Sequence, residues 1–230
     1  MSYYQNKDVL WSFSIQMYCA NMNNPLKQVP QKVLTYEEYV REVSDLVSKK
    51  ATSGSNQSES LVHYTHLNYR RMARLNKTIV PDNELIRLVE AYGNKMKWII
   101  ITEAWCGDAA QNVPYIAKLA DAASNVDLQL VYRDENLDLI NNYLTNGARS
   151  IPKLIAKDVS TGDELFVWGP RPMPVQKMVM DYKDQLDHEK LPFDKFAEVI
   201  HSWYAKDKNE TLKTELLHIF RSLDKPKVKE

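Results

Sequence analysis

The sequence is poor in several features that define whole classes of protein. It has only two cysteines, Cys19 and Cys106, in 230 residues, too few for a fold held together by disulfides. No apolar run approaches the length needed to span a bilayer, and residues 9–20 lack the basic start and continuous apolar run of a signal peptide. We therefore expect a cytoplasmic protein with no membrane partner.

The chain also lacks an excess of either charge. Its 30 Lys and Arg residues balance 30 Asp and Glu residues, so no overall field attracts nucleic acid. Glycine-rich motifs that cradle phosphates are missing. The histidines are scattered, and the close pair His63 and His66 has no further ligand nearby in the sequence. These absences predict no nucleic-acid partner, no metal site and no cofactor.

The most informative segment that is present is a short apolar run leading into a helix through a cysteine. Trp98–Ile101 is continuously apolar, which favours a strand covered on both faces in a mostly parallel sheet. From Ala109 apolar residues recur at helical spacing, so Cys106 is expected at or just before a helix N-terminus. Free backbone N–H groups there favour a thiolate, whereas Asp108 opposes one. The net pKa shift of Cys106 stays open at this point.

Patterns of helix and strand surround this segment. Thr35 and Glu38 form a capping box at the start of one helix. Further helices are predicted over Glu59–Lys77, Pro81–Gly93, Leu137–Leu144, Pro174–Leu186, Phe193–Tyr204 and Thr211–Leu223, and further strands over Asp127–Arg133, Lys153–Lys157 and Glu164–Trp168. The strand starting at Asp127 should run parallel to the first, and the last two strands should form an antiparallel hairpin.

We expect one domain with additions at both ends. Residues 1–31 are predicted to be a loosely held extension, residues 32–95 a helical segment packed on the core, residues 96–190 the core, and residues 191–230 two helices and a frayed tail. The helix Pro174–Leu186 is expected to cover the sheet with its apolar face. The two tail helices are expected to dock on the same domain, with Phe193 on the inward face of the first, and a partner or dimer surface is the alternative. Cys19 is interpreted as an incidental thiol, with a role as resolving partner of Cys106 as the alternative.

Two motifs in this order resemble the thioredoxin superfamily. Ala104-Trp105-Cys106-Gly107, followed by a helix with Pro114, is similar to the thioredoxin active-site segment, and Gly147–Lys153 is similar to the segment carrying the cis-proline. Leu67-Asn68, Arg71-Met72, Cys106–Ala109 and Trp168–Pro172 further resemble a poorly characterised bacterial group of this superfamily. The resemblance implies an α/β thioredoxin-like fold, with a central mixed four-stranded sheet flanked by helices and extra helices at both ends.

The departures from the thioredoxin pattern are informative. Ala109 occupies the position of the second cysteine, and Ile100 the position of the buried acid that serves it, so a local two-cysteine cycle is excluded. The resemblance implies that Cys106 is the catalytic residue and that a cis bond before Pro152 faces it. The substrate groove is then expected to contain Trp105, Gly107, Asp108, Arg149, Ile151 and Pro152.

Two functions of different class follow. The first is a monothiol thiol–disulfide oxidoreductase in which a low-molecular-weight thiol or a cysteine of a disulfide-bearing protein resolves the mixed disulfide. The alternative is a non-catalytic module that holds a peptide or protein in the groove between Cys106 and Pro152. A peroxidase and an iron–sulfur monothiol glutaredoxin rank lower, because the residues around Cys106 lack the motifs of those families. The sequence leaves the oligomeric state open.

Overall fold

A computed structural model describes residues 30–223. The predicted N-terminal extension, apart from its last two residues, and the end of the tail lie outside the described residues, and so does Cys19. The helices are α2 (Tyr36–Ser48), α3 (Glu59–Thr78), α4 (Asn83–Glu90), α5 (Gly107–Ala122), α6 (Leu137–Asn141), α7 (Met173–Asp184), α8 (Phe193–Asp207) and α9 (Glu210–Ser222). The strands are β1 (Met96–Thr102), β2 (Val126–Tyr132), β3 (Lys153–Asp158) and β4 (Glu164–Trp168).

The four strands form one mixed sheet in the order β2-β1-β3-β4. The apolar run predicted as the first strand lies near the centre, where Ile100 of β1 pairs with Leu130 of parallel β2 and with Leu154 of antiparallel β3. β3 and β4 form the predicted antiparallel hairpin. The α/β fold with a mixed four-stranded sheet and extra helices at both ends is therefore confirmed.

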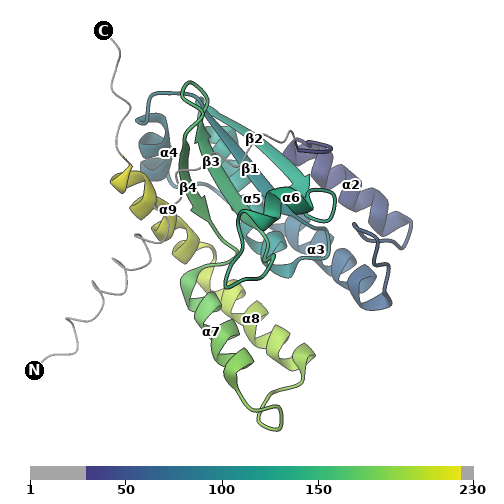
Figure 1. Ribbon diagram of the computed structural model, residues 1–230. Helices are drawn as coiled ribbons and strands as arrows, with labels where there is room; N and C mark the ends of the chain where they lie inside the picture. The colour runs from purple at the N-terminus through teal and green to yellow at the C-terminus, as the bar shows by residue number, and fades with distance from the viewer. Residues whose placement is uncertain (1–29, 224–230) are drawn as a thin grey trace, which may run out of the picture.

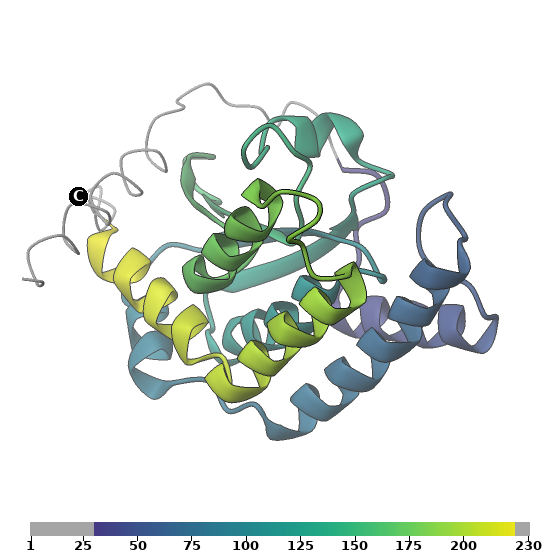
Figure 2. The ribbon, with the colours of Figure 1, turned by 90° about the horizontal axis from the view of Figure 1, so that it is seen from below.

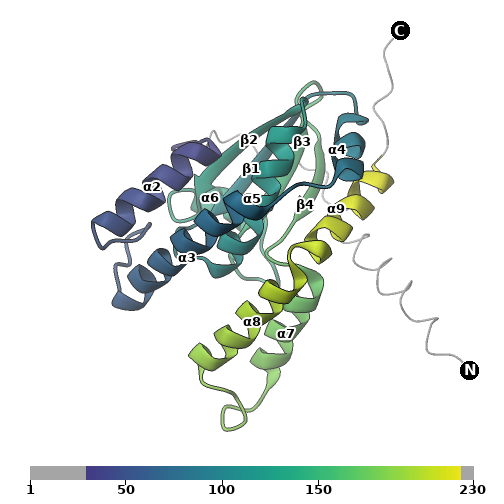
Figure 3. The same cartoon turned by 180° about the vertical axis from the view of Figure 1, so that it is seen from behind.

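Helices cover the two faces of this sheet unequally. α3, α4, α5 and α9 lie on the face seen from behind, whereas α6 lies on the opposite face (Figures 1 and 3). α2 lies beside β2, where Leu34 just before it exchanges two backbone hydrogen bonds with Leu130 at 2.8 and 2.9 Å. The predicted capping box at the start of α2 is present, since the Thr35 hydroxyl accepts from the Glu38 N–H and the Glu38 carboxylate accepts from the Thr35 N–H.

The main core joins the sheet to the last helix. Trp98 of β1 and Phe166 of β4 both pack on Phe220 of α9, with ring centroids 5.9 and 5.3 Å away from that of Phe220. All three side chains are buried. The prediction that the tail helix Thr211–Leu223 docks on the domain is therefore confirmed.

The expectation for the helix Pro174–Leu186 is wrong. Its buried side chain, Val175, belongs to a second, smaller cluster with Ile200 and Tyr204 of α8, and Leu186 lies beyond the end of α7 and is exposed. α7 and α8 together extend away from the end of the sheet (Figures 1 and 3), and they lie side by side when seen from below (Figure 2). The apolar stripe of α7 faces another helix because α9 already covers the aromatic cluster of the sheet.

Two smaller expectations also differ from the structure. α6 ends at Asn141 instead of Leu144, and the next buried residue, Tyr143, leaves the helix and donates its hydroxyl proton to Glu164 at 2.7 Å. Phe193, predicted on the inward face of its helix, is 66% exposed.

The aromatic cluster leads to a stability prediction. Phe220→Ala should lower the free energy of unfolding by about 3 kcal/mol, because it leaves a cavity between α9 and the sheet. The matched variant Phe193→Ala removes the same side chain from an exposed position and should change stability by less than about 0.5 kcal/mol. Urea unfolding followed by circular dichroism measures both. Equal effects of the two substitutions would contradict the packing of α9.

Candidate functional site

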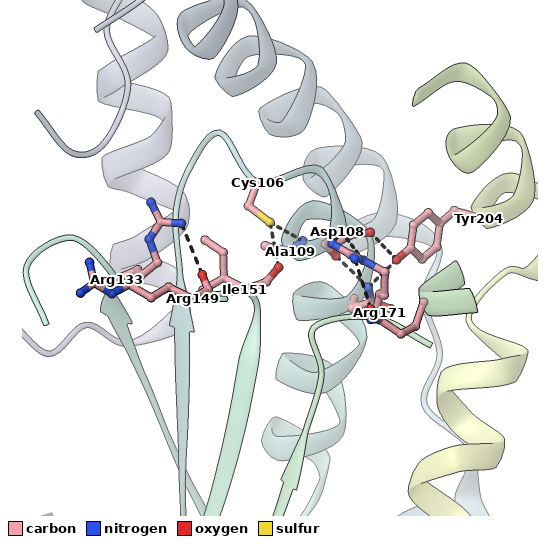
Figure 4. Close-up of polar contacts among 10 residues, drawn as sticks. Cys106, Asp108, Ala109, Arg133, Arg149, Ile151, Arg171 and Tyr204 are labelled. Atoms are coloured by element: carbon pink, nitrogen blue, oxygen red, sulfur yellow. Dashed lines mark hydrogen bonds and ion pairs between the residues drawn. The ribbon is translucent and has the colours of Figure 1, made fainter. Parts of the chain in front are cut away.

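The site begins where β1 ends and α5 starts. Cys106 is the N-cap residue of α5, and its Sγ accepts a hydrogen bond from the Ala109 N–H at 3.4 Å. The thiol donates to the carbonyl oxygen of Ile151 at 3.3 Å (Figure 4). The Ile151–Pro152 peptide bond is cis, so the sulfur faces the cis-proline segment across the end of the sheet.

The segment that carries the cysteine is tied down by the helices that precede it. The hydroxyl of Tyr39 in α2 donates to the Glu103 carbonyl at 3.3 Å, and the amide of Asn68 in α3 donates to the Ala104 carbonyl at 3.0 Å. Ser53, in the loop between these helices, accepts from the Ala104 N–H and donates to the Glu103 carboxylate. These contacts fix the backbone approaching Cys106.

The carboxylate of Glu103 has a structural role, because it links this segment to neighbouring loops. Its side chain is buried and also accepts a hydrogen bond from the Asp134 N–H at 2.9 Å. Burial raises the pKa of its carboxyl group, although the Ser53 and Asp134 hydrogen bonds work in the opposite direction. Both carboxylate oxygens therefore have partners within the loop region.

The carboxylate of Asp108, in the first turn of α5, is bound by side chains from two other elements. Nε and Nη2 of Arg171 lie 2.8 and 2.7 Å from its Oδ2, and the Tyr204 hydroxyl donates to its Oδ1 at 2.7 Å (Figure 4). Asn112, one turn further along α5, donates to the Tyr204 oxygen at 3.1 Å. The cluster links α5, the loop after β4 and α8.

The structure decides the direction of the Cys106 pKa shift, which the sequence left open, because burial outweighs the effect of the helix N-terminus. Burial, and secondly the Asp108 charge, raise the pKa of the Cys106 thiol to about 12, although the Ala109 N–H and the Arg171 charge lower it. The side chain is 7% exposed. The desolvation penalty on a buried anion outweighs one long hydrogen bond from the helix, and the thiol stays protonated at neutral pH.

Arg171 reaches Asp108 because of the loop Trp168–Pro172. The Gly169–Pro170 peptide bond is cis, and Gly169 has a φ of +112°. A Cβ on Gly169 would collide with the Pro152 carbonyl oxygen, so the two proline segments can approach this closely only with glycine here. Lys153 Nζ donates to the Gly169 carbonyl at 3.0 Å.

A cleft of about 680 Å³ opens above the sulfur. Six of the predicted site residues line this cleft, namely Trp105, Cys106, Gly107, Asp108, Arg149 and Ile151. Pro152 is buried and does not line it. α3 supplies Tyr64, and α7 and α8 supply a wall that includes Val179, Tyr182, Phe196 and Ile200. The structure thus brings together all the predicted site residues around one cleft or directly beneath it.

His201 on α8 is a cleft residue that the sequence did not indicate. Its ring lies against Gly107, and neither ring nitrogen has a hydrogen-bond partner within residues 30–223. Burial and the charge of Arg71 lower its pKa to about 4, so the ring is neutral at pH 7. The sequence did not indicate Tyr204 either. Both residues lie more than ninety positions after the segment around Cys106, and Tyr204 is 96 residues from Asp108.

Comparison with known proteins agrees with this geometry. A family model described as thioredoxin matches residues 54–184, more than half of the chain. The chain belongs to the thioredoxin family. This confirms the resemblance drawn from the two motifs around Cys106 and Pro152.

Solved structures add little to the family assignment. A protein of unknown function from Pseudomonas aeruginosa matches with 14% identity and a TM-score of 0.47, covering 82% of this chain and 98% of its own. An HIV epitope scaffold matches with 14% identity and a TM-score of 0.48, covering 77% and 96%. No curated protein matches. Neither structural match indicates a function for this thioredoxin-family chain.

Membrane-spanning helices and metal-binding clusters are both absent from the described part of this thioredoxin-family chain. Among the described residues, no helix has the length and apolar character to cross a membrane. In the same part of the chain, no group of three or more His, Cys, Asp and Glu side chains is arranged to hold a metal ion.

The raised pKa predicts how the thiol responds to pH. In a Cys19→Ser variant, alkylation of folded Cys106 by iodoacetamide should accelerate about tenfold per pH unit between about pH 7 and about pH 10, because the thiolate fraction still rises there. In urea the same cysteine should level off above about pH 9, as an ordinary thiol does. Peptide mass spectrometry measures both rates. A plateau of the folded protein near pH 8 would contradict the buried, protonated thiol.

The ion pair beside the sulfur predicts two opposite effects. Asp108→Asn should speed alkylation of Cys106 at about pH 8 several-fold, because it removes a charge that raises the thiol pKa, and Arg171→Gln should slow it. Circular dichroism checks that both variants remain folded, because each leaves a partly buried partner unpaired. Changes in the same direction would show that altered exposure, and not charge, controls the thiol.

Proposed function

We propose that this protein is a monothiol thiol–disulfide oxidoreductase that uses Cys106 as its attacking sulfur. One observation carries the proposal. Sγ of Cys106 lies at the start of α5, on the floor of the cleft, 3.3 Å from the carbonyl oxygen that precedes the cis bond to Pro152. A sulfur in this position meets a ligand disulfide laid along the Ile151 backbone.

The chemistry needs one protein sulfur and one external thiol. Sγ attacks a sulfur of the ligand disulfide, a new S–S bond joins Cys106 to one half of the ligand, and the other half leaves as a thiolate that takes up the Cys106 proton. A second thiol, from a low-molecular-weight compound or a partner protein, then attacks the mixed disulfide and releases Cys106. Such thiols are abundant in the reducing cytoplasm, where we place the protein.

The neighbouring residues have separate parts in this proposal. Trp105 stacks with Arg133, whose guanidinium lies 4.8 Å from the ring centroid, and gives the cleft a rigid apolar side. Gly107 lets the His201 ring lie close to this turn, because a Cβ here would come within 3.4 Å of His201 Cε1. Asp108 is a positioning residue that holds Arg171 near the thiol. Arg149 lines the cleft and is available to bind an anionic group of the ligand.

A second candidate is favoured by the burial of the same thiol. With a pKa of about 12, Cys106 has very little thiolate at neutral pH. A module that binds a peptide or protein in the cleft needs no thiolate at all. Under this alternative the protonated sulfur and Ile151 would serve only as part of the binding floor.

Turnover separates the two candidates. Wild type and Cys19→Ser should exchange with a glutathione mixed disulfide and show a thiol adduct by intact mass, whereas Cys106→Ser should lose both, a drop of at least about a hundredfold above background. The rate should rise with pH, as the raised thiol pKa requires. Wild type that shows neither adduct nor turnover with several disulfides, while Cys106→Ser binds a peptide as tightly as wild type, would establish the binding module instead.

A further inference from the structure

We infer that the cleft selects a small disulfide that carries carboxylates, an inference about the substrate class of the thiol–disulfide exchange proposed above. The charge of the cleft is the first observation. Arg133, Arg149, Arg171 and Lys183 line it, whereas Asp108 is the one carboxylate in its lining. The whole chain carries no net charge, so this concentration of cations is local to the site.

Two of these cations have no carboxylate of their own. Arg171 is paired with Asp108, and Arg133 with Asp134 at 2.8 Å. Arg149 bonds through Nε to the neutral amide of Asn141 at 2.8 Å, and Lys183 has no hydrogen-bond or ion-pair partner in the part of the chain that the structure describes. Both side chains are exposed at the cleft and free to meet an anion.

These groups line the cleft from different elements. Arg149 comes from the loop just before the cis-proline and lies with Arg133 on one side of Cys106, whereas Arg171 lies on the other side (Figure 4). Lys183 comes from the last turn of α7. Carboxylates at two points of a ligand therefore find cations while its disulfide lies over Sγ.

The size and lining of the cleft favour a small ligand. Its volume of about 680 Å³ falls in the range of about 300–1,000 Å³ typical of small-molecule sites. The lining also includes His201 beside Gly107, and its neutral ring leaves the charge of the cleft to the arginines and Lys183.

Three small disulfides of different charge test the inference on the full chain. Oxidised glutathione is anionic, hydroxyethyl disulfide is neutral and cystamine is cationic. We expect mixed-disulfide formation at Cys106 to be at least about tenfold faster with oxidised glutathione than with cystamine, after correction for their rates with free cysteine, and the advantage to shrink as salt is added. Equal corrected rates would overturn the inference. A preference shown only by a long acidic peptide disulfide would overturn its restriction to small ligands.

Charge reversal identifies the residues responsible. The double variant Arg149→Glu/Lys183→Glu should lose about tenfold in rate with oxidised glutathione and gain with cystamine. Arg70→Glu/Arg74→Glu is the matched control with the same change in net charge, because both side chains are exposed on α3 and neither lines the cleft, and it should leave both rates unchanged. Equal effects of the control and the double variant would show that only the overall charge matters, which overturns the inference.

A binding measurement separates this inference from the exchange reaction. Calorimetry with Cys106→Ser should show oxidised glutathione binding more tightly than cystamine, and the preference should disappear in the background of Arg149→Glu/Lys183→Glu. If binding shows this preference while wild type forms no mixed disulfide, the exchange proposal fails and the anion selectivity stands. If wild type exchanges with all three disulfides equally and Cys106→Ser binds none preferentially, the selectivity fails and the exchange stands.

Discussion

The ion pair between Asp108 and Arg171 joins the elements that surround Cys106. Asp108 stands in the first turn of α5, Arg171 comes from the loop after β4, and the Tyr204 hydroxyl from α8 completes the carboxylate's partners. The pair therefore joins the sheet-bound helix, the proline loop and the α7–α8 hairpin that walls the cleft. Because its atoms are largely shielded from water, its charges act strongly on the neighbouring sulfur.

The same pair places two charges of opposite sign beside Cys106, and they have opposite effects on the pKa of its thiol. The carboxylate opposes the thiolate and the guanidinium favours it, so their effects partly cancel, and burial then decides in favour of the protonated thiol. Reactivity in such a site depends on what enters the cleft. In the proposed exchange, a ligand disulfide held against Sγ receives the proton on its leaving sulfur, so that no free thiolate has to persist in the buried site.

Local patterns in the sequence were sufficient to predict much of the fold. The apolar run Trp98–Ile101, the capping box at Thr35 and the turn before Glu164 each depend on near neighbours, and each appears where the pattern predicts it. The helix from Met173 shows where this reasoning stops. Its apolar stripe marks a buried face, but the stripe cannot say whether a sheet or another helix covers it. In the folded chain the stripe packs on α8, whereas α9 covers the aromatic side chains of the sheet.

By itself the sequence determined the family, the four strands and the place of Cys106 at a helix start, because periodicity, caps and short motifs act over a few residues. The tertiary structure alone decided the protonation of that sulfur and the neighbours that surround it. His201 and Tyr204 come to Gly107 and Asp108 from almost a hundred residues away. Burial and charge proximity are properties of packed space, and no local pattern encodes how far apart such distant residues lie once the chain has folded.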